Sequence, residues 1–366
     1  MSSSSKDGEY VLHGLKCSLF TGKIEAYLQS KGLPFRFVEM DQADFRACGK
    51  ATGIMQMPSI EAPDGTWLTD STLIMDHFER ADVGPRIRPE DPATAFCSFL
   101  LEDLFDEWYW RPALYYRWAF EEDAKLMSRQ IARTLLRDSR QPLFLRQRFI
   151  LRRQRTVYLK KDGVTKETAP AIEALYMDSL RELEIVFSRR PYLFGERPCE
   201  ADFGLFAPFF RHFFCDPTAG ALMREHAPQV THWVTRLWQA RPSDLEDTPP
   251  NSFVPEDLGF FFEMAASDYF PYLEANAQSF VAGEKDVRYS GQGAGWCVPT
   301  APYRVQCFND LKTKFSALES EAADHVAKFL PPEGIKLLQG ATTPVEHPAK
   351  KQGLSGRLWR RSSMYD

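Results

Sequence analysis

The sequence predicts an α/β domain at residues 9–82, an all-helical domain at residues 91–242 and a mostly helical extension at residues 243–366. Three observations support this prediction. Strand and helix patterns alternate in the first part, helical periodicity dominates after residue 96, and a stretch rich in proline and charge, Ala81–Pro92, separates the two parts like an interdomain linker. A chain of 366 residues is long enough for two domains that each bury a core.

The first part is expected to follow the order strand, helix, strand, irregular stretch, hairpin and helix. Its elements are placed by runs of β-formers and by apolar helical spacing: a strand at Tyr10–Gly14, a helix with Ile24, Tyr27 and Leu28 on one face, a strand at Phe35–Glu39, and hairpin strands at Ser59–Glu61 and Thr66–Leu68. The Asp64-Gly65 pair favours a tight turn between the hairpin strands. This order is that of a thioredoxin-like domain.

The hairpin is followed by Asp70-Ser71, an acidic-hydroxyl pair that opens an amphipathic helix. The free amides at a helix N-terminus bind carboxylates well, and Ser71 adds a hydroxyl there. Asp70 is suited to meet an ammonium group. The pair therefore favours a ligand with an amino-acid end that carries both charges.

Three motifs in this order resemble the glutathione transferase superfamily, in particular its serine- and cysteine-type members, which are similar to the zeta and omega classes. They are Cys17-Ser18-Leu19-Phe20-Thr21-Gly22-Lys23, then Met57-Pro58, then Asp70-Ser71. The resemblance covers about the first 240 residues and is bacterial-type, with a long C-terminal extension beyond the usual end of the family. It implies a thioredoxin-like domain that binds glutathione as a co-substrate, followed by a helical domain that holds a second substrate.

The resemblance implies that a hydroxyl just before the first helix activates the glutathione thiol. A donated hydrogen bond and a helix N-terminus both lower the pKa of a thiol. Ser18 lies five residues before Lys23, as in the serine and cysteine classes, and is the expected donor. Cys17 and Thr21 remain alternatives, and Cys17 would shift the chemistry toward thiol-disulfide exchange. A serine before a helix is also a common N-cap.

For glutathione itself, the resemblance implies that Met57 offers its backbone N–H and C=O to the cysteinyl part, with Pro58 in the cis form. Gln56 is expected to assist, and Lys50 is the expected partner of the glycine carboxylate. Together with Asp70 and Ser71, these residues make up the predicted glutathione site.

In the helical domain, Glu107, Trp108 and Tyr115 are expected to line a pocket for a small apolar or aromatic electrophile. His212 lies in an apolar stretch and is expected to be a core residue. In the second motif of the resemblance, Cys199 replaces the usual hydroxyl cap, with Asp202 three residues later.

Residues 128–166 carry twelve Arg and Lys residues against only two acidic residues. Such a segment is either a solvated helical face or a contact for an anionic ligand or surface. In the extension, helical periodicity covers 258–280 and 303–329, and the stretch between them is expected to form a short hairpin or lid.

The composition excludes several classes of protein. The net charge of −5 argues against a general nucleic-acid binder, and no apolar run is long enough for a transmembrane segment. The seven cysteines contain no CxxC pair, so no zinc or other metal site is indicated, and the polar start of the chain lacks a signal-peptide core. We therefore expect a cytoplasmic protein with no metal and no nucleic-acid partner, and the resemblance implies a homodimer.

The resemblance implies an enzyme in which the glutathione thiolate attacks an electrophilic carbon, by conjugation, ring opening, dehalogenation or ether cleavage. Three alternatives remain at this point. They are a non-catalytic binding or assembly protein of the same fold, a glutathione-dependent thiol oxidoreductase that uses Cys17, and an anion- or membrane-surface-binding protein built on residues 128–166.

Overall fold

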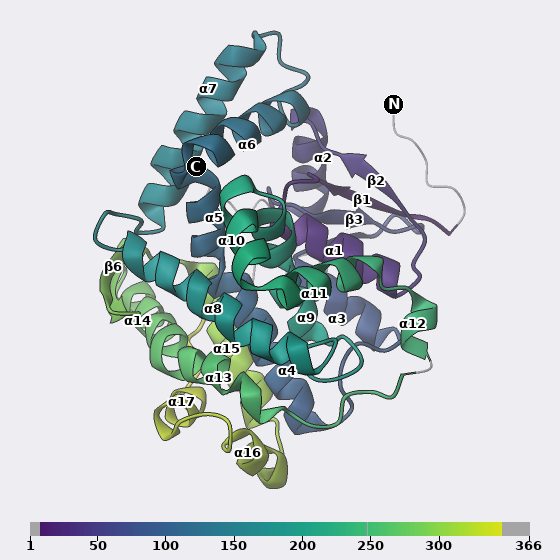
Figure 1. Ribbon diagram of the computed structural model, residues 1–366, viewed down its shortest axis with the longest axis vertical. Helices are drawn as coiled ribbons and strands as arrows, with labels where there is room; N and C mark the ends of the chain where they lie inside the picture. The colour runs from purple at the N-terminus through teal and green to yellow at the C-terminus, as the bar shows by residue number, and fades with distance from the viewer. Residues whose placement is uncertain (1–7, 247, 346–366) are drawn as a thin grey trace.

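The computed structural model describes residues 8–246 and 248–345, and it has a thioredoxin-like domain followed by a helical domain and a further helical layer (Figure 1). The basic end of the chain at residues 350–366, which the sequence predicts to be frayed, lies outside the described residues. No helix among the described residues is long and apolar enough to cross a membrane.

The thioredoxin-like domain has one mixed sheet with the strand order β2-β1-β3-β4. Its strands are β1 (Tyr10–Gly14), β2 (Phe35–Glu39), β3 (Ser59–Glu61) and β4 (Trp67–Thr69), and its helices are α1 (Leu19–Ser30), α2 (Gln42–Thr52) and α3 (Ser71–Arg80). Strand β1 pairs parallel with β2 and antiparallel with β3, which pairs antiparallel with β4. The predicted positions of the first three strands are confirmed, and β4 begins one residue later than the expected Thr66–Leu68.

Helix α2 corrects one expectation, because the sequence was interpreted as irregular between the second strand and the hairpin. Asp41 and Asp44 form a reciprocal capping box at its start, and Gly53 ends it in the left-handed conformation with φ of 78°. These end signals are present in the sequence, but the helix between them has a weak apolar face with only three buried residues, Cys48, Gly49 and Thr52.

The helical domain follows the linker. Its helices are α4 (Pro92–Trp108), α5 (Trp110–Ala119), α6 (Glu121–Thr134), α7 (Leu143–Arg153), α8 (Ala169–Arg189), α9 (Glu200–Pro208), α10 (Pro217–His226), α11 (Pro228–Gln239) and the short α12 (Pro242–Glu246), with π-helical turns η1 (Gln154–Leu159) and η2 (Phe209–Phe214). The basic segment forms the end of α6, then α7 and η1, and α7 projects at the top of Figure 1.

Helix α9 lies at the centre of the molecule and is buried along its whole length. It packs against α4 and α1, and a Cβ on Gly204 would lie 2.7 Å from the Cα of Glu102, so only glycine permits this approach. Asp202 accepts from the backbone N–H of Cys199 at 3.0 Å and from Trp233 Nε1 at 3.1 Å. The acidic half of the predicted capping box is therefore present, although a cysteine occupies the cap position.

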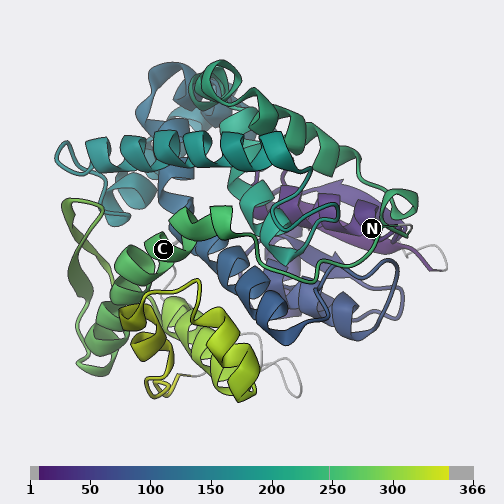
Figure 2. The ribbon, with the colours of Figure 1, turned by 60° about the horizontal axis from the view of Figure 1, so that its bottom comes forward.

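The extension packs against α4 (Figure 2). It contains η3 (Glu256–Leu258), α13 (Gly259–Met264), η4 (Ala265–Tyr269), α14 (Phe270–Val281), the hairpin β5 (Asp286–Gly291) and β6 (Ala294–Pro299), then α15 (Pro302–Ser316), α16 (Ser320–Val326) and α17 (Pro332–Leu338). The ring centroids of Phe96 and Phe315 are 5.5 Å apart, and those of Trp108 and Tyr269 are 5.8 Å apart. The predicted hairpin is confirmed, and it brings α15 back toward the thioredoxin-like domain.

Candidate functional site

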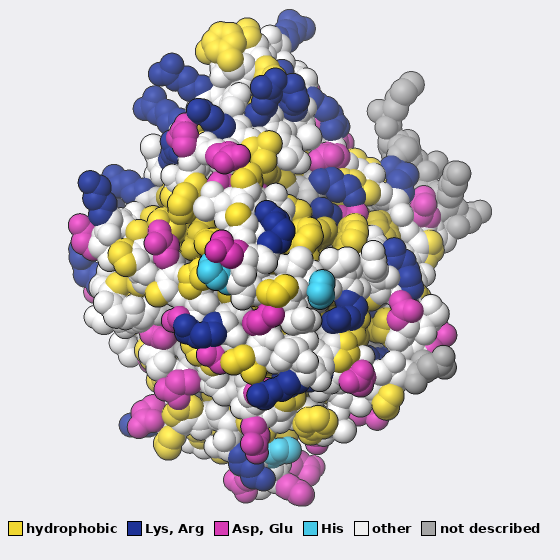
Figure 3. All heavy atoms as spheres, viewed as in Figure 1, with side chains coloured by type: hydrophobic (Ala, Val, Ile, Leu, Met, Phe, Trp, Pro, Cys, Tyr) yellow, Lys and Arg dark blue, Asp and Glu magenta, His cyan; other side chains and the backbone are white. Residues whose placement is uncertain are grey.

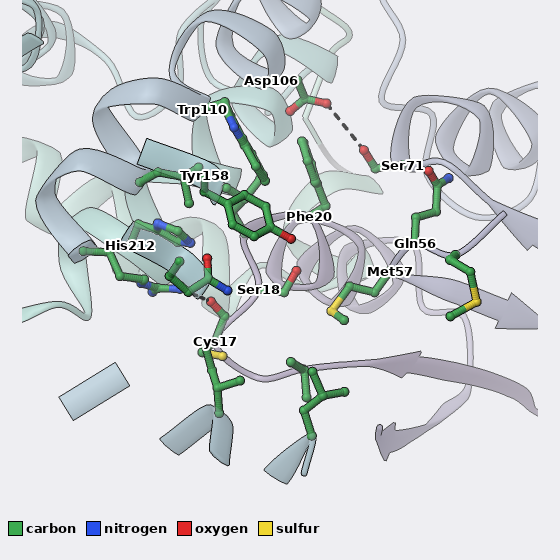
Figure 4. Close-up of a pocket in the computed structure, with 18 of the residues that line it drawn as sticks. Cys17, Ser18, Phe20, Gln56, Met57, Ser71, Asp106, Trp110, Tyr158 and His212 are labelled. Atoms are coloured by element: carbon green, nitrogen blue, oxygen red, sulfur yellow. Dashed lines mark hydrogen bonds between the residues drawn. The ribbon is translucent and has the colours of Figure 1, made fainter. Parts of the chain in front are cut away.

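A cavity of about 460 Å³ opens where the thioredoxin-like domain, the helical domain and the extension meet. Its lining from the first domain comes from the turn after β1, the start of α1, α2, the loop before β3 and the start of α3. The remaining lining comes from α4 to α7, η1, η2 and α15. The site is thus built from segments that are distant in sequence (Figure 4).

Ser18 lines this cavity at the start of α1. Its Oγ accepts from the backbone N–H of Thr21 at 3.5 Å, so the residue is the N-cap of the helix. A capping hydroxyl still has its own O–H to donate. The structural role and the donor role are therefore compatible at this position, and both lie at the positive end of the helix dipole.

The two alternatives to Ser18 are placed differently. Cys17 lines the cavity, but burial raises the pKa of its thiol and disfavours the thiolate. Thr21 is fully buried against Gly14 and is not part of the cavity wall, so the expectation that Thr21 is an alternative donor is wrong.

The loop before β3 supplies the next part of the wall. The Met57-Pro58 bond is cis, as the resemblance implied, and Met57 lines the cavity. Among the described residues, neither the N–H nor the C=O of Met57 has a hydrogen-bond partner. Gln56 also lines the cavity, and its Nε2 donates to Thr69 Oγ1 at 3.1 Å. Pro58 itself is buried behind this edge.

Asp70 and Ser71 lie at the start of α3 and both line the cavity. Asp70 has a φ of 77°, which is rare for a residue other than glycine, and its Oδ1 accepts from the N–H of Leu73 at 3.4 Å. Its second oxygen accepts from the hydroxyl of Tyr303 at 2.8 Å. Ser71 donates to Asp106 Oδ2 at 3.4 Å.

A buried charge cluster lies directly behind Ser71. The Nζ of Lys23 is 2.5 Å from both Glu102 Oε1 and Asp106 Oδ2, and the lysine is fully buried. Burial alone would lower the pKa of Lys23, but the attraction of Asp106 and Glu102 raises it above its usual value. Burial raises the pKa of Asp106. In the sequence Lys23 serves only to mark the position of Ser18, and this cluster was not predicted.

The signal for the cluster was present in α4. Glu102 and Asp106 are four residues apart, so both carboxylates lie on one face of the helix. Most of the residues around them in α4 are buried. Two acidic residues on a buried face require a cation, and the sequence does not show which one it is.

An apolar wall faces this polar edge. The rings of Phe20 and Trp110 are stacked with their centroids 6.1 Å apart, and the ring centroids of Tyr158 and Trp110 are 6.4 Å apart. Trp110 Nε1 donates to Asp162 Oδ2 at 3.1 Å. The wall is completed by aliphatic and aromatic side chains of α5, of α6 and of its C-cap residue: Leu114, Trp118, Ile131 and Leu135.

Several predicted binding residues do not reach the cavity. Of the three residues expected in the electrophile pocket, only Glu107 lines it. Trp108 is buried against Tyr269, and the hydroxyl of Tyr115 donates to Glu173 on α8. Lys50 is exposed near the end of α2 and is not part of the cavity wall. The predictions for Trp108, Tyr115 and Lys50 are wrong because local sequence does not determine which face of a packed helix meets the cavity.

The extension supplies two lining residues that the sequence analysis did not predict, Tyr303 and Arg304. Arg304 Nε donates to Glu107 Oε2 at 3.1 Å, and its Nη1 donates to the hydroxyl of Tyr272 at 2.7 Å. The guanidinium is almost fully buried. The extension is therefore part of the site and is anchored there by a buried ion pair.

His212, expected to be a core residue, also lines the cavity. It is 4% exposed, and its Nδ1 is 2.9 Å from the carbonyl oxygen of Ala113. Burial lowers the pKa of His212 well below its usual value, and the nearby Arg117 lowers it further. The imidazole is thus neutral near pH 7.

Comparison with known families gives one match, to the model described as "Glutathione S-transferase, N-terminal domain", over residues 12–86. This range contains Ser18, Met57, Asp70 and Ser71. A comparison with curated proteins gives no match.

Solved structures give many matches. A glutathione S-transferase of Methylobacterium radiotolerans in complex with glutathione sulfonate is 19% identical, with a TM-score of 0.38, over 68% of this chain and 98% of that chain. The β-etherase LigF of Sphingobium sp. strain SYK-6 is 22% identical, with a TM-score of 0.46, over 65% and 99% of the two chains. FzlA of C. crescentus is 20% identical, with a TM-score of 0.41, over 68% and 96%.

Proposed function

We propose that this chain, whose residues 12–86 match the N-terminal domain of glutathione S-transferases, binds glutathione in the cavity and activates its thiol. The thiolate then attacks an electrophilic carbon of a small apolar or aromatic substrate. The observation that carries the proposal is the convergence of Ser18, Met57, Asp70 and Ser71 on one cavity whose other wall is apolar.

The chemistry of each group favours one arrangement of glutathione. The α-carboxylate would accept from the first amides of α3 and from the Ser71 hydroxyl, which would exchange its 3.4 Å bond to Asp106 for this one, and the ammonium group would meet Asp70. The unpaired N–H and C=O of Met57 are suited to the cysteinyl amide. In this arrangement the sulfur would point toward Ser18, which lies between the Met57 and His212 sides of the cavity in Figure 4.

A hydrogen bond donated by Ser18 would stabilise the thiolate and lower the pKa of the bound thiol. The thiolate is the reactive nucleophile, and attack at carbon leads to conjugation, ring opening, dehalogenation or ether cleavage, according to the leaving group. The apolar wall of Phe20, Trp110 and Tyr158 favours a flat, partly aromatic electrophile.

Calorimetric titration with reduced glutathione tests this proposal, with Ser71→Ala, Ser18→Ala and Ser188→Ala measured alongside the unaltered protein. Ser71→Ala is expected to weaken glutathione binding. Ser18→Ala is expected to leave the affinity largely intact, raise the pKa of the bound thiol and slow turnover, as followed by the ultraviolet absorbance of the thiolate. Ser188 is exposed and bonds only within its own helix, so its variant is the control.

Absence of binding at millimolar glutathione would contradict the proposal and favour a non-catalytic member of the fold. An unchanged turnover rate in Ser18→Ala would remove the proposed role of Ser18. The oxidoreductase alternative requires a reactive Cys17, which is opposed by the raised pKa of that thiol. Full activity of Cys17→Ala would exclude this alternative.

The surface of α7 favours a second candidate function, binding to an anionic membrane surface. Its exposed stripe consists of Phe144, Leu145, Arg148, Phe149 and Arg152, and the two phenylalanines are 67% and 55% exposed. Figure 3 shows apolar side chains at this end of the molecule with Lys and Arg side chains beside them. Among the described residues, Arg148 and Arg152 have no acidic partner. Apolar rings beside unpaired arginines suit an interfacial helix.

Sedimentation with vesicles that contain phosphatidylserine tests this second function. The protein is expected to pellet at low salt and to be released by high salt, and Phe144→Ser with Phe149→Ser is expected to abolish pelleting. Val281→Ser is the control, because Val281 is 71% exposed on the extension, away from α7. Equal recovery in the supernatant with and without vesicles would contradict the second function.

A further inference from the structure

The two ring nitrogens of His212 differ in their hydrogen bonding, because Nδ1 has a partner and Nε2 faces the cavity. The carbonyl oxygen of Ala113 can only accept, so the ring nitrogen 2.9 Å from it, Nδ1, carries the proton and donates. This fixes the neutral tautomer in which Nε2 has a lone pair and no proton. Among the described residues Nε2 has no hydrogen-bond partner, and it is not sealed from the cavity.

The surroundings keep this imidazole neutral. The side chain is 4% exposed, and the nearby cation is the guanidinium of Arg117, which is held by Asp216 at 2.7 Å and by the carbonyl oxygen of Cys17 at 2.6 Å. Protonation of His212 would place a second positive charge beside Arg117 in a buried site. The cavity therefore presents a fixed acceptor at this point, and a ligand satisfies it only with a donor.

The acceptor belongs to the part of the cavity that glutathione is not expected to fill. In Figure 4, Gln56, Met57 and Ser71 lie on one side of Ser18, and His212 lies on the other. The cavity on the His212 side is lined by Trp110 and Tyr158, whose ring centroids are 6.4 Å apart, so that the two rings pack on each other as one aromatic surface. A flat apolar ligand that lies against this aromatic surface would bring its polar group to the imidazole.

We propose that His212 Nε2 accepts a hydrogen bond from a hydroxyl group on an aromatic second substrate, so that the cavity selects phenols over the matching aryl methyl ethers. The assignment of this region to a second substrate rests on the proposed function. A buried acceptor left without a donor carries the full cost of its desolvation, which corresponds to a preference of about ten- to a hundredfold for the ligand that satisfies it.

Calorimetric binding of 2-naphthol and 2-methoxynaphthalene tests this inference, because the two ligands share the ring system and differ in the donor. The unaltered protein is expected to bind 2-naphthol at least tenfold more tightly. His212→Leu is expected to remove the preference by weakening 2-naphthol alone. His212→Gln is expected to retain much of it, since the Gln Oε1 replaces the Nε2 acceptor. His232→Leu, at an exposed position on α11, is the control.

Equal binding of the two ligands by the unaltered protein would overturn the inference, as would an unchanged preference in His212→Leu. If that variant does not fold, nitrogen NMR of the unaltered protein decides, because accepting a hydrogen bond shifts the Nε2 resonance on addition of 2-naphthol and not of 2-methoxynaphthalene. Absence of that shift overturns the inference. Glutathione titration of the same samples is independent, so failure of this inference is distinguishable from failure of the proposed function.

Discussion

The two walls of the cavity differ in how well the local sequence predicts which residues line them. On the wall formed by the thioredoxin-like domain, six of the nine predicted residues line the cavity, and Thr21, Lys50 and Pro58 do not. On the wall formed by the helical domain and the extension, only Glu107 of the three predicted residues lines the cavity. The rest of this wall comes from six further segments: α5, α6, α7, η1, η2 and α15.

The difference follows from local geometry. An N-cap or a cis proline fixes its neighbours through the backbone, so Ser18, Met57 and Asp70 are positioned by the few residues around them. A residue in the middle of a helix is positioned only by the packing of that helix against others. Trp108 and Trp110 are two residues apart, and only the second faces the cavity.

The largest expected effect concerns the cluster that joins the two walls. Lys23→Met leaves Glu102 and Asp106 buried without their cation, which is expected to lower the free energy of unfolding by about 3–5 kcal/mol. Urea denaturation followed by circular dichroism measures this loss. Lys16→Met is the matched control, because Lys16 pairs with Glu25 but is 40% exposed, and it is expected to cost less than about 1 kcal/mol. Equal losses in the two variants would show that the cluster does not hold the walls together.

The next effect is a pH dependence of the apolar wall. Burial raises the pKa of Asp162, the partner of Trp110, from 3.8 to about 6. The folded state therefore binds more protons than the unfolded state between these values, and this group's contribution to stability falls as the pH rises through the window. In the unaltered protein this group is expected to lower the free energy of unfolding by up to about 3 kcal/mol as the pH rises through the window, and Asp162→Asn is expected to remove that decrease.

Chemical denaturation across the range from about pH 4 to pH 7 measures this dependence. The exposed Asp138 provides the control variant, Asp138→Asn, which is expected to leave the slope unchanged. A slope in Asp162→Asn equal to that of the unaltered protein would mean that the carboxyl of Asp162 is already ionised at low pH in the folded chain.

A smaller effect is expected where the extension meets the predicted glutathione site. Tyr303→Phe removes the hydrogen bond to Asp70 and leaves its carboxylate less fixed, so glutathione affinity is expected to fall about two- to tenfold. Calorimetry measures the change. Tyr176→Phe loses a comparable buried hydrogen bond, to the carbonyl of Ala219, away from the cavity, and is expected to affect stability but not affinity. An unchanged glutathione affinity in Tyr303→Phe would show that glutathione binding depends on the first domain and α4 and not on the extension.

The smallest expected effect concerns the wall formed by the helical domain. Tyr115→Phe loses the hydrogen bond to Glu173 and is expected to cost at most about 1.5 kcal/mol of stability, without changing the binding of 2-naphthol. Trp110→Leu is expected to weaken that binding, because Trp110 forms the wall. A clear loss of 2-naphthol binding in Tyr115→Phe would contradict the position of Tyr115 outside the cavity.

Much of the fold and one wall of the site were predictable from sequence. The strands, the hairpin turn, the caps at Ser18 and Asp70 and the helices of the extension depend on interactions within a few residues. The one missed element of the first domain, α2, has clear end signals and a weak apolar face, so periodicity alone did not identify it.

Only the tertiary structure determined the rest of the site, because its contacts join residues that are distant in the chain. Lys23 meets Glu102 and Asp106 across 79 and 83 residues, and Tyr303 meets Asp70 across 233. From the sequence alone, Glu102 and Asp106 form an acidic pair on a buried helix face, and Asp70 is a capping residue. The sequence did not specify the partners of these three residues. Helix packing selected those partners, since a buried charge is stable only beside the particular group that the fold brings to it.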